Sequence, residues 1–472
     1  MLRYARGSRW LFQSPGKGGV ISLFLLSLLA LSGFAQQTRI EIPYTRFTLS
    51  NGLNVILHED HTTPTVALNI WYHVGSAREK PGRTGLAHLF EHLMFEGSQH
   101  VPERKFDQWL EATGGENNAS TAQDRTNYYL TVPRNALELP LFLESDRMGF
   151  LLPAMSPATV DGQRDVVKNE RRESVENQPY GMSEDILPEN LYPPEHPYHW
   201  PIIGSMADLS AASYEDVVGF FKTYYSPSNA SLCVAGDIDP ATTRALVEKW
   251  FSDVPGGRPE LPLAKPAVTL TTEKRLYYQD NVQLPRLYMV WLSPAAYTPG
   301  DAELDLLANV LGRGKNSRLY RRLVYDLQIA QDVFVYQSQG ELNSTFGIIV
   351  TARSGHGLTE IEKVIQEELN RIKAEAAQRR ELERAVNQYE SGFLRQIEIV
   401  SQKADQLNAY YTMTGNPDYF NEDLARYKAV DPDDIRAIAE TYLKDDARLV
   451  LSIVPKGRKD LASGDGKEVE GR

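Results

Sequence analysis

The sequence predicts an α+β protein built from two homologous mixed α/β domains, and two observations carry that prediction. The chain has 472 residues, which is too long for one ordinary domain. Patterns typical of strands and helices follow one another along the chain, and the second half repeats the order of the first. An α+β unit that is used twice accounts for both observations.

The repeat is faint in identity but clear in the order of its elements. An expected helix at 214–224 precedes an expected strand at 230–235, and a helix at 433–443 precedes a strand at 449–454. An Asn51-Gly52 pair between two apolar runs predicts a hairpin near the start. Four prolines and two glycines in residues 254–266 have the composition of a linker between the two copies.

These features predict five segments along the chain. They are a signal peptide at 1–35, an N-terminal domain at 40–253, a Pro-rich linker at 254–272, a homologous C-terminal domain at 273–460, and a polar tail at 461–472. The tail is polar enough that we expect it to be disordered.

The N-terminus predicts export. A basic stretch ends at Lys17, an apolar run follows at 20–31, and Gly33 and Ala35 place small residues where a signal peptidase cleaves. The apolar run is too short to span a bilayer stably. We therefore expect a cleaved signal peptide and a periplasmic or secreted protein. A retained membrane anchor and an organellar transit peptide are the alternatives.

Charge and cysteine content exclude some classes of function. The net charge is −12, and removal of residues 1–35, which hold four basic and no acidic residues, brings it to about −16. So negative a net charge speaks against nucleic acid as a partner, because phosphate binding requires a basic face. The single cysteine, Cys233, cannot form an internal disulfide and is expected in a buried strand.

The segment that carries chemistry reads Gly85-Leu-Ala-His88-Leu-Phe-Glu91-His92. On a helix, His88 and His92 project from one face and can share a metal ion, with Glu91 on the same side. Zinc held by two histidines and a carboxylate keeps one position for water, and a neighbouring carboxylate can take a proton from that water. The order H-x-x-E-H is a recognised inverted zinc motif. A pair of surface or capping histidines is the structural alternative, but apolar neighbours disfavour it.

The sequence around this motif resembles the pitrilysin family of zinc peptidases, which includes insulysin and mitochondrial processing peptidase. The resemblance runs from about Phe47 to Gly457. Its specific parts are residues 75–79, 85–97, 114–129, 163–172, 225–232 and 312–320.

The resemblance implies the remaining site residues. Glu170 stands at the family's third ligand position, which gives one zinc ion per chain bound by His88, His92 and Glu170, with Glu91 as the base. Glu173 would share a helix face with Glu170, so it is the alternative ligand or a partner to a ligating histidine. Gln163 stands where the family usually has a supporting glutamate, and an amide cannot act as a base there.

The resemblance also implies how peptide substrates are held. Asn118 and Ala119 match the family's edge strand, which binds substrate backbone by strand addition. The second copy has Leu304-Asp-Leu-Leu-Ala308 near the motif position and offers no metal-binding histidine. The expected function is hydrolysis of peptides or unfolded chains in a closed chamber.

The chain has two such domains where long relatives have four, so the resemblance implies half of a clamshell. In those relatives the other half supplies an arginine and a tyrosine near the substrate carbonyl. Here Phe346 and Gly357 stand about where those residues belong. A heterodimer with a motif-less sister subunit is therefore favoured over a homodimer. The competing functions are a non-catalytic assembly subunit of the same fold and a zinc hydrolase that acts on a non-peptide.

Overall fold

The structure is a computed structural model that describes residues 39–258 and 261–470. It divides into units 1–40 and 41–472, and the helices and strands below lie in the second unit. The expected signal peptide at 1–35 lies outside the described residues, so cleavage and export stay predictions. In the described part, no helix has both the length and the apolar character needed to cross a membrane.

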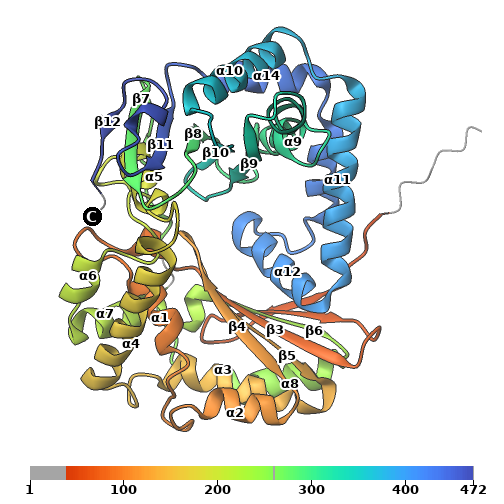
Figure 1. The fold of residues 1–472 in the computed structure, drawn as a ribbon. Helices are drawn as coiled ribbons and strands as arrows, with labels where there is room; N and C mark the ends of the chain where they lie inside the picture. The colour runs from red at the N-terminus through yellow and green to blue at the C-terminus, as the bar shows by residue number, and fades with distance from the viewer. Residues whose placement is uncertain (1–38, 259–260, 471–472) are drawn as a thin grey trace, which may run out of the picture. The chain divides into compact units, whose positions relative to one another are not determined.

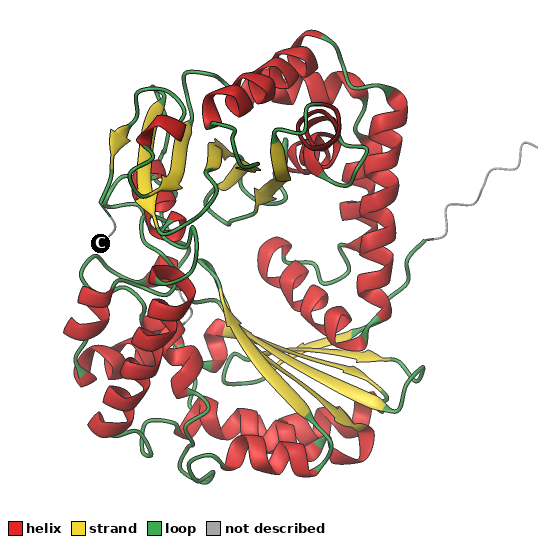
Figure 2. Cartoon of the chain, in the orientation of Figure 1, coloured by secondary structure: helices red, strands yellow, loops and turns green. Residues whose placement is uncertain are grey.

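The first half of the chain forms one sheet with its helices (Figures 1 and 2). Its strands are β1 (Thr45–Thr48), β2 (Asn54–Glu59), β3 (Thr65–Tyr72), β4 (Glu116–Thr121), β5 (Thr126–Pro133) and β6 (Ala230–Gly236). Its helices are α1 (Leu86–Leu93), α2 (Lys105–Ala112), α3 (Glu138–Phe150), α4 (Pro157–Arg171), α5 (Ser183–Leu191), α6 (Met206–Ala211), α7 (Tyr214–Tyr224) and α8 (Pro240–Phe251).

The second half forms another sheet with its own helices. Its strands are β7 (Lys274–Asp280), β8 (Arg286–Ser293), β9 (Ala330–Ser338), β10 (Ser344–Ala352), β11 (Leu449–Pro455) and β12 (Lys467–Glu468). Its helices are α9 (Asp301–Gly312), α10 (Leu358–Ala374), α11 (Arg379–Glu398), α12 (Val400–Thr414), α13 (Phe420–Ala429) and α14 (Pro432–Tyr442).

Five strands of each sheet have the same topology, and the sixth strand differs. Their strand orders are β1-β2-β6-β3-β5-β4 and β12-β7-β11-β8-β10-β9. The parallel pair β2–β6 of the first sheet corresponds to the parallel pair β7–β11 of the second, and β4 and β9 are the corresponding edge strands. The second sheet has a further parallel pair, β7–β12. This confirms the predicted fold class of two similar mixed α/β parts. The exact domain bounds stay predictions.

Local sequence explains several of these elements. Gly52 has a φ of 96°, a left-handed conformation that glycine adopts without strain, and it makes the turn between β1 and β2. The N-cap Ser213 and Asp216 form a reciprocal capping box that starts α7. Gly300 and Glu303 mark the start of α9, the second-half counterpart of α1.

The two halves share contacts that the repeat pattern does not predict. Helix α12 of the second half packs on β3 and β6 of the first sheet, opposite α3 and α8 (Figure 1). One oxygen of Asp405 on α12 accepts hydrogen bonds from Asn69 at 3.1 Å, Trp71 at 2.8 Å and Asn127 at 3.0 Å. The hydrophobic core of the first half also extends into the second, through residues such as Leu451.

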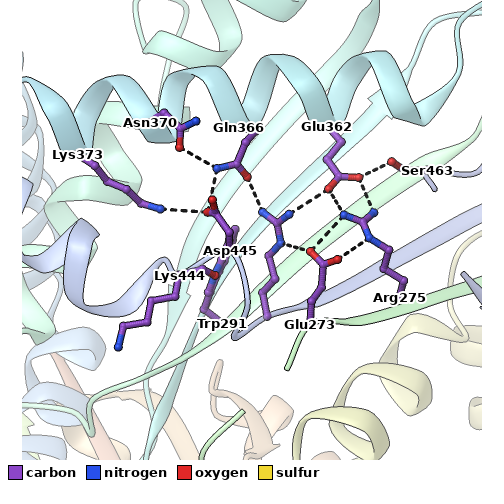
Figure 3. Close-up of polar contacts among 11 residues, drawn as sticks. Glu273, Arg275, Trp291, Glu362, Gln366, Asn370, Lys373, Lys444, Asp445 and Ser463 are labelled. Atoms are coloured by element: carbon purple, nitrogen blue, oxygen red, sulfur yellow. Dashed lines mark hydrogen bonds and ion pairs between the residues drawn. The ribbon is translucent and has the colours of Figure 1, made fainter. Parts of the chain in front are cut away.

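The expectation of a disordered tail is wrong for the residues the structure describes. Strand β12 pairs in parallel with β7, which would otherwise present an open edge. Ser463 donates a hydrogen bond to Glu362, which also binds the guanidinium of Arg275 (Figure 3). A polar tail can thus be ordered when it pairs with an edge strand and forms hydrogen bonds with a buried charged side chain.

Candidate metal centre

Helix α1 presents one apolar face and one polar face. Leu86, Leu89, Phe90 and Leu93 are buried, so the side chains of the H-x-x-E-H motif lie on the opposite, half-buried side. The helix starts after Gly85, whose φ is 89°. A Cβ atom at that position would lie 2.7 Å from the carbonyl oxygen of Ile203, so glycine is required by both conformation and space.

A buried carboxylate fixes the N-terminus of α1. The two carboxylate oxygens of Glu79 accept hydrogen bonds from the backbone N–H groups of Gly85 and Ala87, both at 2.8 Å. These are among the N–H groups that a helix leaves without partners inside itself. Burial raises the pKa of Glu79 to about 8, against the opposing effect of these hydrogen bonds. Glu79 therefore holds the first turn just before His88.

Glu170 comes from the last turn of α4, which packs against α1. The helix starts at the N-cap Ser156, whose hydroxyl accepts a hydrogen bond from the N–H of Thr159. At its other end, buried Arg171 pairs with Asp185 and donates to the carbonyl of Gly204 at 2.8 Å. These bonds fix the turn of helix that carries Glu170.

The side chains of His88, His92 and Glu170 converge. Each offers one ligand atom, and these atoms lie within 4.8 Å of one another. The Nε2 atom of His88 lies 3.5 Å from one Glu170 oxygen, and the Nε2 atom of His92 lies 3.1 Å from the other. Zinc bonds of 2.0–2.1 Å in tetrahedral geometry place ligand atoms about 3.4 Å apart. The donor set and its spacing therefore fit zinc, with one position left for water.

The electrostatics of the cluster favour the protonation states that ligands need. Burial lowers the pKa of His88 more than Glu170 raises it. The hydrogen bond with His92 lowers the pKa of Glu170. Neutral imidazole and ionised carboxylate are the forms that bind metal. The buried Nδ1 atom of His88 has no hydrogen-bond partner among the described residues, so no hydrogen bond at that nitrogen orients the ring.

Glu91 is held toward the edge strand. Its carboxylate accepts a hydrogen bond of 2.6 Å from the hydroxyl of Thr121, the last residue of β4. Sequence reasoning missed Thr121, because the contact joins residues thirty positions apart and no local pattern marks it. The bond fixes the Glu91 side chain between its own helix and β4.

Strand β4 is the free edge of the first sheet beside α1. Among the described strands it pairs only with β5, with Asn118 opposite Tyr129 and Ala119 opposite Tyr128. Asn118 is exposed, and its side-chain oxygen accepts a hydrogen bond from the N–H of Ala119 at 2.8 Å. The backbone of β4 is therefore available for another strand on its outer side.

Glu173 and Gln163, the two further candidates from the sequence, lie outside the cluster of His88, His92 and Glu170. Glu173 is exposed in the π-helical turn η3 (Arg172–Glu176) that follows α4. Gln163 donates a hydrogen bond of 2.6 Å to Glu96. In the second half, Leu304 and Ala308 of α9 are buried, and the described residues contain no second group of three potential ligands. The structure thus brings together His88, His92 and Glu170 but not Glu173 or Gln163. The metal-binding roles of the three residues stay predictions.

Comparison with known proteins places similar sequences among zinc proteases. Residues 54–196 match the family model described as insulinase (peptidase family M16), and residues 211–389 match the one described as peptidase M16 inactive domain. The zinc protease PqqE of Helicobacter pylori is 27% identical over 442 residues, which is 93% of this chain and 98% of that protein.

Solved structures show the same fold. A protease from Helicobacter pylori aligns with a TM-score of 0.82 at 27% identity, covering 88% of this chain and 100% of that chain. The periplasmic protease PqqL of Escherichia coli aligns with a TM-score of 0.74 at 17% identity. That alignment covers 90% of this chain but 49% of PqqL, so the fold described here corresponds to half of the longer protein.

Proposed function

Because the chain belongs to peptidase family M16, we propose that it is a zinc endopeptidase whose metal is bound by His88, His92 and Glu170. The observation that carries the proposal is the convergence of these three side chains at distances that fit zinc. Similar chains named zinc proteases support a peptidase function. The substrates we propose are peptides or unfolded chains, because an edge strand lies beside the cluster.

The proposed chemistry divides between the metal and the chain. Bound zinc would polarise the scissile carbonyl and lower the pKa of a water to about 7. Glu91 takes a proton from the attacking water and delivers it to the leaving amine. Thr121 orients Glu91 through its hydrogen bond to the carboxylate. Strand β4 pairs with the substrate backbone next to Asn118 and Ala119, so main-chain hydrogen bonds give affinity with little side-chain selectivity.

Chelator-sensitive cleavage tests this function against its alternatives. The purified chain would be assayed for zinc and for hydrolysis of an unstructured peptide, with and without a chelator. Zinc-dependent cleavage supports the proposal. Bound zinc without cleavage, under every partner condition described below, would favour a non-catalytic subunit, which the inactive-domain match at 211–389 keeps as the second candidate.

Substitution of Thr121 by valine is expected to lower kcat about tenfold and to leave zinc content and KM within about twofold. Valine keeps the β-branched shape but cannot donate a hydrogen bond to Glu91, and one such bond to a charged group is worth about 1.5–3 kcal/mol. Thr121→Ser keeps the hydroxyl and should retain most activity. Steady-state kinetics of both variants test this prediction. If the valine variant has the kcat of the parent, the Thr121 hydroxyl does not support catalysis by Glu91.

We further propose that the chain acts with a second two-domain subunit. The chain corresponds to half the length of PqqL. Phe346 on β10 is fully buried beside Trp291, so this position offers no hydrogen-bond donor to a substrate carbonyl. Gly357, the N-cap of α10, has no side chain to offer. A motif-less sister subunit that carries such donors is the favoured partner, with a homodimer as the alternative.

Activity of the chain alone is expected to be weak and to rise when the sister subunit is added. Loss of one donor to the developing oxyanion costs about 2.7–4 kcal/mol, which is about 10²–10³ in kcat. The measurements are cleavage rate and mass in solution, first for the chain alone and then after mixing. Full activity as a homodimer without any added subunit would contradict this proposal, and it would still support the zinc endopeptidase.

A further inference from the structure

An open groove runs along one face of α11 in the second half. Its volume is about 600 Å³, and arginines from α11 and from the loop after α9 line it. Arg380, Arg384 and Arg395 lie on α11 at helical spacings of four and eleven residues, which puts them on one side of that helix. Arg313 contributes from the end of α9. We call this feature the arginine groove.

The arginine groove is basic in a chain whose net charge is −12. Among its described lining residues the only carboxylate is that of Glu383. None of the four arginines is in an ion pair with another described residue. Other arginines of the same half do find carboxylates: Arg318 binds Glu381 at 2.6 Å, and Arg275 binds Glu362 at 2.6 Å (Figure 3). The positive charge of the groove is therefore only partly offset, by Glu383 in the lining and by Glu381, whose pKa the charge of Arg384 lowers.

The polar atoms of the groove are poorly satisfied. A terminal nitrogen of Arg384 is buried and has no hydrogen-bond partner among the described residues, an arrangement that costs free energy when no acceptor is present. Within residues 39–258 and 261–470, Arg395 donates only to the hydroxyl of Ser391, at 3.1 Å. Arg384 and Arg395 therefore both have guanidinium N–H groups that can donate hydrogen bonds to an oxyanion.

Arg313 is partly engaged elsewhere. It also lines a neighbouring cavity of about 370 Å³ that contains Asp305. Burial raises the pKa of Asp305 to about 6, and the charge of Arg313 acts in the opposite direction. The excess positive charge of the groove therefore lies chiefly on the three arginines of α11.

We propose that the arginine groove binds the carboxylates of an acidic peptide segment. Planar guanidinium groups match carboxylates with paired hydrogen bonds. The fifteen-residue step from Arg380 to Arg395 corresponds to about 22 Å of helix, which is the length of roughly seven extended residues. Charges spread over that length suit an extended chain better than a single small anion. No aromatic side chain lines the groove in the described residues, so nucleic acid bases have no stacking surface.

The test measures binding directly and does not depend on catalysis. The probe is a fluorescein-labelled peptide of six glutamates flanked by Gly-Ser, and its binding to the full, zinc-loaded chain is followed by fluorescence anisotropy at two salt concentrations. Mass spectrometry confirms that the peptide stays intact. The double variant Arg380→Gln/Arg384→Gln is expected to weaken binding at least about tenfold and to reduce its salt dependence.

The matched control is Arg353→Gln/Arg379→Gln. It removes the same charge from two arginines outside the groove, one of them next to Arg380, and should change Kd by less than about twofold. Thermal melts show whether each variant is folded. The proposal is overturned if the groove variant binds like the parent or if the control weakens binding equally. It is also overturned if inorganic tripolyphosphate binds the groove while the glutamate peptide does not.

Discussion

Replacement of Glu91 by glutamine is expected to lower kcat by about 10²–10⁴-fold while zinc remains bound, because general acid–base catalysis contributes about that much. The amide has the size of the carboxylate and can still accept the hydrogen bond from Thr121, so the geometry of the site is kept. It cannot take a proton from water at neutral pH. Peptide hydrolysis measured alongside zinc content separates the two effects.

Glu173→Gln is the matched control for this change. It makes the same substitution at an exposed carboxylate outside the cluster, and kcat should stay within about twofold. Turnover close to that of the parent in a fully metallated Glu91→Gln protein would show that another group acts as the base.

Replacement of Glu170 by glutamine is expected to remove zinc from the purified protein. Glu170 is the only carboxylate in the described three-residue cluster, and a neutral amide is a poor zinc ligand. The loss of affinity should exceed the roughly 10–100-fold that follows when an outer partner of a ligand is removed. Zinc per chain and competition with a chelator give the two readouts.

The same measurements on Glu173→Gln decide which carboxylate binds the metal. Full zinc content is expected in that variant, since Glu173 lies in the turn beyond α4. If Glu173→Gln loses more zinc than Glu170→Gln, the ligand assignment moves to Glu173. Thermal melts in the presence of chelator distinguish loss of metal from loss of fold.

Much of the site follows from local sequence, because His88, Glu91 and His92 sit on one helix whose periodicity fixes which side they share. The third metal ligand could not be assigned from local sequence alone. Helical spacing alone allowed both Glu170 and Glu173. The structure separates them because α4 ends at Arg171, where the pair with buried Asp185 fixes the turn, and a wider π-helical turn follows.

Contacts between distant segments account for what sequence reasoning missed. The bond between Thr121 and Glu91 joins a strand to a helix through tertiary packing, and no local rule encodes it. The docking of α12 on the first sheet is of the same kind, since Asp405 finds its partners more than 250 positions away. The ordered end of the chain likewise depends on Ser463 meeting Glu362, 101 positions apart.

Because α12 packs on the first sheet, the two halves of this molecule are not structurally independent. The sequence repeat divides the chain near residue 254, but a cut there would leave Asn69, Trp71 and Asn127 without the carboxylate that accepts their hydrogen bonds. It would also uncover core residues such as Leu451, which pack with the first half. The repeated segments are copies in pattern, yet each depends on contacts with the other. Cooperativity should therefore belong to residues 41–472 as a whole.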